Sequence, residues 1–172
     1  MRKKLKQLGQ AERHTFEGVF KSVGIKHSYH GKSNPIYLPS LLFSPVSCDG
    51  EPMTNHLWCN YTKQFLALGQ LVPGDRVRFD ARVTSYVKGH YPNKITDYGI
   101  ERPTKVQLIE DNSKLAREPM PMTKEDRNVL IGYIMNANQE FYLETGRPYE
   151  KYYVDQYKAW CLQLARQSKL IN

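Results

Sequence analysis

Alternating apolar and polar positions predict five β-strands in the first two thirds of the chain. The clearest run is Arg76–Val87, which follows a Pro-Gly-Asp turn. One face of this run is apolar, and the other begins with three arginines and an aspartate. In chain order, the other four predicted strands are Thr15–Val23, Ile36–Phe43, His56–Tyr61 and Tyr98–Ile109.

A short helix is predicted between the third and fourth of these strands, over Thr62–Gln70. Thr62 stands at a capping position, Phe65 and Leu66 supply apolar surface, and Gly69 stands where a helix would end. The predicted order of elements in this part of the chain is therefore β-β-β-α-β-β.

After Met120 the pattern becomes helical. Thr123 and Asp126 have the spacing of a capping box, and Gly146 followed by Pro148 predicts the end of one helix and the start of another. An apolar stripe along the second helix is formed by Tyr153, Tyr157, Trp160 and Leu164. We expect this stripe to dock on the β-rich part, because two amphipathic helices alone bury too little surface. Contact with a second chain is the alternative.

These patterns divide the chain into four predicted parts. A basic arm covers residues 1–13 and is expected to be mobile in the free protein. A β-rich domain covers residues 14–110, a linker 111–122, and a helical hairpin 123–170. The predicted fold class is α+β.

The β-β-β-α-β-β order and the run Leu71–Val83, with the pattern LxPGDxVxFxARV, resemble the OB-fold. The resemblance implies a five-stranded Greek-key barrel over residues 14–110. It also implies that a bound oligonucleotide lies on the second and third strands, between the loop joining strands one and two and the loop joining strands four and five. The sequence HLWCNYTKQF followed by PGDRVRFDARVTSYVKG is also similar to small proteins of bacteriophages and mobile elements.

The charge distribution points to a polyanionic partner. The net charge is +8, and it belongs to the first 105 residues because acidic and basic side chains balance over residues 106–172. A basic excess of this kind is typical of proteins that bind nucleic acid.

The two loops that the resemblance singles out have matching composition. Each contains two lysines, a tyrosine, a glycine and at least one histidine. Lysines can neutralise phosphates, and a tyrosine ring can stack on a base for about 1–3 kcal/mol. The candidate binding residues in the loops are Lys26, Tyr29, Lys32, Lys88, Tyr91 and Lys94.

Aromatic residues on the predicted second and third strands are further candidates for stacking. If Leu57 and Cys59 face the interior, Trp58 lies on the outer face. The opposite register would bury Trp58 and expose Tyr61. Tyr37, on the second strand, is a candidate with the same ambiguity.

The arginines of the fourth predicted strand have two interpretations. Arg76, Arg78 and Arg82 have the spacing of cations that follow a phosphate backbone. Alternatively, they form a solvated face that Asp80 partly neutralises.

The sequence predicts no catalytic residue, metal site or cofactor. Gly31-Lys32-Ser33 has Lys26 where a phosphate-binding loop needs glycine. His56 and Cys59 are three residues apart on a predicted strand, so they should point to opposite faces instead of binding one zinc ion. The three scattered cysteines fit a reducing compartment, and no apolar run predicts a signal peptide or a membrane span, so we expect a cytoplasmic protein.

The leading hypothesis is noncatalytic binding of single-stranded nucleic acid, with DNA as the expected strand and little sequence preference. One alternative is a module that binds a protein of a replication, recombination or defence complex, or that self-associates through the C-terminal helices. A third is an RNA-binding barrel.

Overall fold

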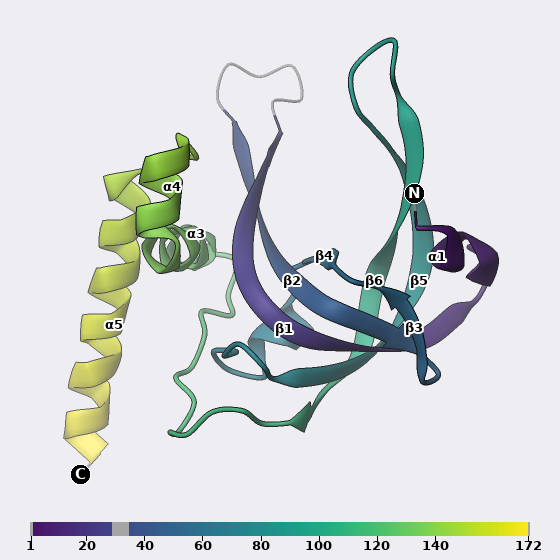
Figure 1. Cartoon of the computed structure of the whole chain (residues 1–172). Helices are drawn as coiled ribbons and strands as arrows, with labels where there is room; N and C mark the ends of the chain where they lie inside the picture. Colours follow the sequence, from purple (N-terminus) through teal and green to yellow (C-terminus); the bar gives the residue numbers. More distant parts are fainter. Residues whose placement is uncertain (1, 29–34, 172) are drawn as a thin grey trace. The chain divides into compact units, whose positions relative to one another are not determined.

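The computed structural model describes residues 2–28 and 35–171 of the chain (Figure 1). It confirms the α+β class. In chain order the elements are α1 (Lys3–Leu8), β1 (Arg13–Ser28), β2 (Ile36–Cys48), β3 (Glu51–Thr54), β4 (Leu57–Asn60), α2 (Lys63–Leu66), β5 (Arg76–Lys88), β6 (Ile95–Glu110), α3 (Arg127–Ala137), α4 (Gln139–Thr145) and α5 (Lys151–Ile171).

The chain forms two compact units. The first, called the sheet unit below, comprises Met1–Ser22 and Leu41–Pro119. The second, called the helical unit, comprises Val23–Ser40 and Met120–Asn172. Strands β1 and β2 therefore contribute to both units, whereas the sequence assigns their whole length to the β-rich domain.

The strands form a six-stranded antiparallel sheet in the order β3-β2-β1-β5-β6, and β4 pairs with β2. Phe16 of β1 lies opposite Phe79 of β5, and Gly18 lies opposite Val77. A Cβ atom on Gly18 would lie 2.8 Å from the Phe43 ring, so the close approach of β1 and β2 requires glycine here. Over the described residues the sheet does not close into a continuous barrel, although β4 comes close to β6.

The centre of the sheet unit is formed by four fully buried phenylalanines: Phe16, Phe43, Phe65 and Phe79. Phe43 and Phe79 have ring centroids 5.6 Å apart, and Phe65 of α2 contacts both rings. The predicted apolar face of β5 is confirmed, because Val77, Phe79, Ala81 and Val83 are all buried.

Strand β3 is an element that the sequence analysis missed. It pairs with the end of β2, with Cys48 opposite Glu51. The connecting residues, Asp49 and Gly50, both have positive φ angles, of 50° and 81°. Asp-Gly is a strong signal for a two-residue hairpin turn, so the sequence contained the information that identifies β3.

The first residues form helix α1, where a mobile arm is predicted. Leu5 is completely buried, and the Lys4 ammonium donates a hydrogen bond to the Pro52 carbonyl at 2.7 Å. These contacts hold the helix on the sheet unit. The prediction of a mobile arm is wrong because it rests on charge alone. Leu5, in the middle of the basic run, is the apolar residue that anchors the helix.

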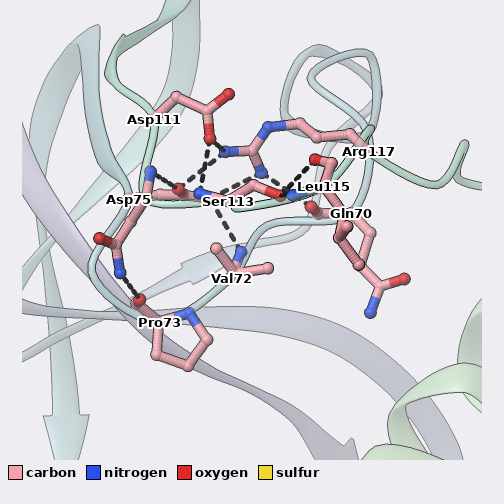
Figure 2. A network of polar contacts seen from close by, with 9 residues as sticks. Gln70, Val72, Pro73, Asp75, Asp111, Ser113, Leu115 and Arg117 are labelled. Atoms are coloured by element: carbon pink, nitrogen blue, oxygen red, sulfur yellow. Dashed lines mark hydrogen bonds and ion pairs between the residues drawn. The ribbon is translucent and has the colours of Figure 1, made fainter.

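The beginning of the predicted linker is fixed to the turn that precedes β5 (Figure 2). Arg117 binds the buried Asp75 carboxylate. The Gln70 backbone N–H donates to the Glu118 backbone carbonyl at 2.8 Å. The Asn112 side chain donates to the Pro73 carbonyl at 2.7 Å. Residues 111–118 are therefore part of the sheet unit instead of a free connection.

The helical unit contains the end of β1 from Val23 onward, the start of β2 up to Ser40, and the helices α3, α4 and α5. Its core consists of Tyr37, Ile131, Met135 and Val154, with Ile25, Tyr149 and Tyr153 packed against it. Helices α3 and α5 cross closely at Gly132, where a Cβ atom would lie 1.8 Å from the Tyr153 carbonyl oxygen. The helices pack against the ends of β1 and β2 that belong to the helical unit, and docking of the α5 stripe on the rest of the β-rich part stays a prediction.

The structure tests two local predictions for this region. Thr123 and Asp126 make the reciprocal contacts of the predicted pair, with the Thr123 hydroxyl donating to the Asp126 carboxylate at 2.8 Å, but these contacts precede α3, which begins at Arg127 with Asp126 as its N-cap residue. Gly146 ends α4 in the left-handed conformation, with φ 65°. The predicted stripe on α5 is partly buried along its length, and its neighbour Val154 is the residue of α5 that is fully buried.

Candidate functional site

Exposed aromatic and cationic side chains of the sheet unit gather on the end of the β5–β6 hairpin. Figure 1 shows these two strands continuing past α1 as a two-stranded arm. In this arm Ser85 lies opposite Tyr98, and Lys88 lies opposite Ile95. Residues 85–98 are called the β5–β6 arm below.

The arm exposes several large side chains to solvent. Tyr91, at its tip, has 87% of its surface exposed. Tyr86, Val87 and Ile95 are also exposed. An exposed patch of this kind on a sheet is typical of an interaction surface.

A buried carboxylate anchors the base of the arm. Asp97 accepts hydrogen bonds from the Arg2 backbone amide at 2.7 Å and from the Lys88 ammonium at 2.6 Å. The Arg2 guanidinium approaches Asp97 at 3.3 Å and donates to the Tyr86 hydroxyl at 2.9 Å. These four residues, called the Asp97 cluster below, join α1 to the arm.

The Asp97 cluster keeps a net positive charge. Burial of the carboxylate opposes its ionisation, but the hydrogen bonds from Lys88 and from the Arg2 and Tyr98 amides outweigh that effect and hold the pKa of Asp97 well below its usual range. Two cations therefore surround one anion. The Lys88 side chain remains 44% exposed, so its charge also faces solvent.

Strand β4 presents Trp58 on its outer face. Leu57 and Cys59 are buried, while the Trp58 side chain is 47% exposed. Of the two registers that the sequence allows, the structure therefore has the one with Trp58 outside.

Strand β4 pairs with β2 and also contacts β6. Burial raises the pKa of the Cys59 thiol, and the charge of Arg2 acts in the opposite direction. Arg2 in turn binds Asp97 of β6, and β4 and β6 approach each other. β4 and the β5–β6 hairpin are therefore neighbours within the sheet unit, and Trp58 lies on the exposed face of β4, opposite to Leu57 and Cys59.

The cations at the tip of the arm are exposed. Lys94 and His90 both lie at the surface, in the same loop as Tyr91. Of the predicted site residues, the structure thus brings Lys88, Tyr91 and Lys94 together on the arm.

The arginines of β5 do not form a row of unpaired cations. Arg78 donates two hydrogen bonds to the Glu17 carboxylate, at 2.9 and 2.7 Å. Arg76 binds Glu17 at 3.1 Å and Glu110 at 3.3 Å. Arg82 is only partly exposed. The alternative of a neutralised solvated face describes this surface better, but the carboxylates come from Glu17 of β1 and Glu110 of β6, whereas Asp80 binds Lys105.

The prediction that Tyr37 and Tyr61 could stack on bases is wrong, because both side chains are buried. Tyr37 packs in the core of the helical unit, and its hydroxyl donates to Glu150. Tyr61 is 7% exposed, since it continues the buried side of β4. Neither ring offers an open face on which a base can stack.

The other predicted loop, between β1 and β2, is described only at its edges. Lys26 is exposed and lies in the helical unit beside a cavity. Tyr29 and Lys32 lie outside the described residues, so their predicted roles stay predictions.

Three members of the site were missed by the sequence analysis: Arg2, Tyr86 and Asp97. Tyr86 falls on the predicted fourth strand, and its position near the end of the alternating pattern is a signal that the ring is exposed. No local pattern links Arg2 with Asp97, because 95 positions separate them.

No protein-family model matches the chain, and no curated protein or solved structure matches it. None of the described helices is both long and apolar enough to cross a membrane. The described residues also contain no group of three or more histidine, cysteine or acidic side chains placed to hold a metal ion.

Proposed function

We propose that the sheet unit has an OB-like fold, open where β4 and β6 do not pair, and binds single-stranded DNA without catalysis and with little sequence preference. The observation that carries the proposal is that β4, which exposes the indole of Trp58, contacts β6, a strand of the hairpin whose end exposes Lys88, Tyr91 and Lys94. Indole and phenol rings stack on any base, for about 1–3 kcal/mol each. Stacking on Trp58 and Tyr91 accounts for affinity that does not depend on sequence.

The strand order supports the OB-like part of this proposal. Helix α2 lies between β4 and β5, and β2 has β1 on one side and β3 and β4 on the other. In OB-folds the second and third strands and the adjoining loops contact the oligonucleotide. Strand β4 and the β5–β6 arm correspond to two of these elements.

The cations on the arm supply the electrostatic part. Lys94 at the tip and Lys88 in the last strand pair before the tip are exposed on an arm that also carries Tyr91. Phosphates that bind these lysines release counterions, so the affinity should fall as the salt concentration rises.

Fluorescence anisotropy with labelled oligo(dT), measured at several salt concentrations, tests the proposal. We expect saturable binding that weakens with salt, and weaker binding of a duplex of the same length. The absence of binding at low salt would refute the proposal. Competition with oligo(U) distinguishes DNA from RNA, and tighter binding of RNA would favour the RNA-binding alternative.

A protein-interaction module is the second candidate, and α5 carries the observation that favours it. Leu162, Leu170 and Ile171 are exposed on this helix. If the purified chain captures no oligonucleotide and self-associates in sedimentation experiments, this candidate replaces the first.

A further inference from the structure

A cavity in the helical unit lies between the end of β1 and the turn that follows α4. Its volume is about 470 Å³, and its walls come from Ile25, Lys26, His27, Tyr142, Thr145, Gly146, Arg147 and Pro148. This volume lies within the range of small-molecule sites in proteins. The cavity belongs entirely to the helical unit and is separate from the site on the sheet unit.

Hydrogen bonds between the two walls hold the cavity in shape. The Ile25 backbone amide donates to the Tyr142 hydroxyl at 3.0 Å. The Asn138 side chain donates to the Val23 carbonyl at 3.1 Å. Tyr142 is buried, so its ring forms a fixed wall instead of a mobile surface group.

The charge of the cavity is positive. Lys26, His27 and Arg147 are basic, and no acidic side chain occurs among the described residues that line it. The Arg147 guanidinium lies over the Phe141 ring, 5.0 Å from its centroid, which restricts where its charge can lie. Arginine and lysine together are typical of sites that bind phosphate.

The helix end at the cavity does not cancel this charge. The last carbonyls of α4 would repel an anion, but the Arg147 amide donates to the Tyr142 carbonyl at 2.9 Å. The amide at the helix cap, Gly146, donates to the same carbonyl. The Thr145 hydroxyl donates to the Phe141 carbonyl at 2.5 Å. The basic side chains are therefore the groups that can bind a ligand.

The remaining lining is apolar or aromatic. Ile25, Pro148 and the ring of Tyr142 provide surface that an inorganic ion leaves uncovered. A ligand that satisfies both parts of the cavity has a phosphate group attached to a flat, partly apolar body.

We propose that this cavity binds the phosphate monoester of a nucleotide, with Arg147 and Lys26 holding the phosphate. The same chemistry comes from two sources, a free nucleoside monophosphate or the 5′-phosphorylated end of a single strand. The proposal does not require the sheet unit to bind DNA.

Calorimetric titration of the full chain with adenosine 5′-monophosphate tests the proposal, with inorganic phosphate as competitor. Arg147→Gln should weaken binding about tenfold or more, because it removes a charged hydrogen bond to phosphate. Arg166→Gln, the same change at an exposed site on α5, should leave binding within about twofold. Lys26→Gln is the second variant and should weaken binding in the same direction, and circular dichroism checks that each variant is folded.

Oligonucleotides with and without a 5′-phosphate distinguish the two sources. A preference for the phosphorylated strand that Arg147→Gln abolishes identifies the strand end as the ligand. Binding of the monophosphate with no such preference identifies a free nucleotide. Failure of the monophosphate to bind, together with equal affinity for both strands, overturns the proposal. The Trp58→Ala variant separates the two sites, since it should reduce binding of the unphosphorylated strand and leave the monophosphate affinity unchanged.

Discussion

Arg117 holds the completely buried carboxylate of Asp75 with both ends of its guanidinium group. Its Nη1 and Nη2 atoms each lie 2.7 Å from one carboxylate oxygen. The backbone N–H groups of Val72 and Asn112 donate to the same carboxylate, each at 2.8 Å. The Asp75 of the Pro-Gly-Asp turn is thus a structural anchor that joins the start of β5 to the segment after β6 (Figure 2).

Replacement of Arg117 should destabilise the sheet unit. In Arg117→Met, Asp75 remains buried without its counterion, so we expect the free energy of unfolding to fall by about 3–5 kcal/mol. Urea denaturation followed by circular dichroism measures the change. Lys114→Met is the control, because Lys114 is an exposed cation of the same segment. Equal stabilities for the two variants would contradict the anchoring role.

The stability of the protein should fall in acid. The pKa values of Asp75 and Asp97 are lowered because, despite their burial, the hydrogen bonds and cations around them favour the ionised carboxylate. A lowered pKa contributes stability above the unfolded value of about 4, and this contribution is lost as the pH falls from there toward the folded value. The free energy of unfolding should therefore be steady near neutral pH and decline below about pH 4.

Asp97→Asn isolates one of these carboxylates. We expect it to lower the free energy of unfolding at pH 7 by about 1–3 kcal/mol, since Lys88 and Arg2 lose a charged partner. The decline in acid should also become shallower, because one carboxylate no longer titrates. An acid dependence as steep as that of the unmodified protein would contradict this assignment.

Trp58→Ala should weaken binding of oligo(dT) by about tenfold, the equivalent of one lost stacking interaction. Because the side chain is 47% exposed, the thermal midpoint should change little. Tyr152→Ala is the matched control, as this exposed ring lies in the helical unit. If binding survives Trp58→Ala unchanged, the indole does not contact the strand.

The salt dependence of binding should distinguish exposed from ion-paired cations. Lys94→Gln should reduce the slope of the logarithm of affinity against the logarithm of salt concentration by about 0.7, the value for one phosphate contact with a single strand. Arg78→Gln should leave the slope unchanged, because Glu17 already neutralises Arg78. Anisotropy titrations at several salt concentrations measure both slopes. If Arg78→Gln reduces the slope and Lys94→Gln does not, the β5 arginines contact the phosphates and Lys94 does not.

Gly132→Ala should disrupt the helical unit. The added methyl group would overlap the Tyr153 carbonyl oxygen, so α3 and α5 have to separate. We expect a loss of about 3 kcal/mol or more in the free energy of unfolding. Gly99→Ala is the control, because there a methyl group meets the Tyr86 ring at an ordinary 3.5 Å and should change stability by about 1 kcal/mol or less.

Local patterns determined most of the elements of this protein. Alternation identified the buried face of β5, and the glycine and proline after α4 marked the break between helices, because each depends on neighbouring residues alone. Loop composition likewise identified Lys88, Tyr91 and Lys94 as exposed residues of one hairpin.

The tertiary structure decided which elements meet and which charges remain unpaired. Only the pairing of distant strands brings Glu17 to Arg78, and only the folding of α1 onto the hairpin brings Arg2 to Asp97. Local patterns also left open the outward position of Trp58 and the burial of Tyr37 beneath α3 and α5. These contacts join residues far apart in the chain, and periodicity carries information only about the face of an element, not about the partner that covers it.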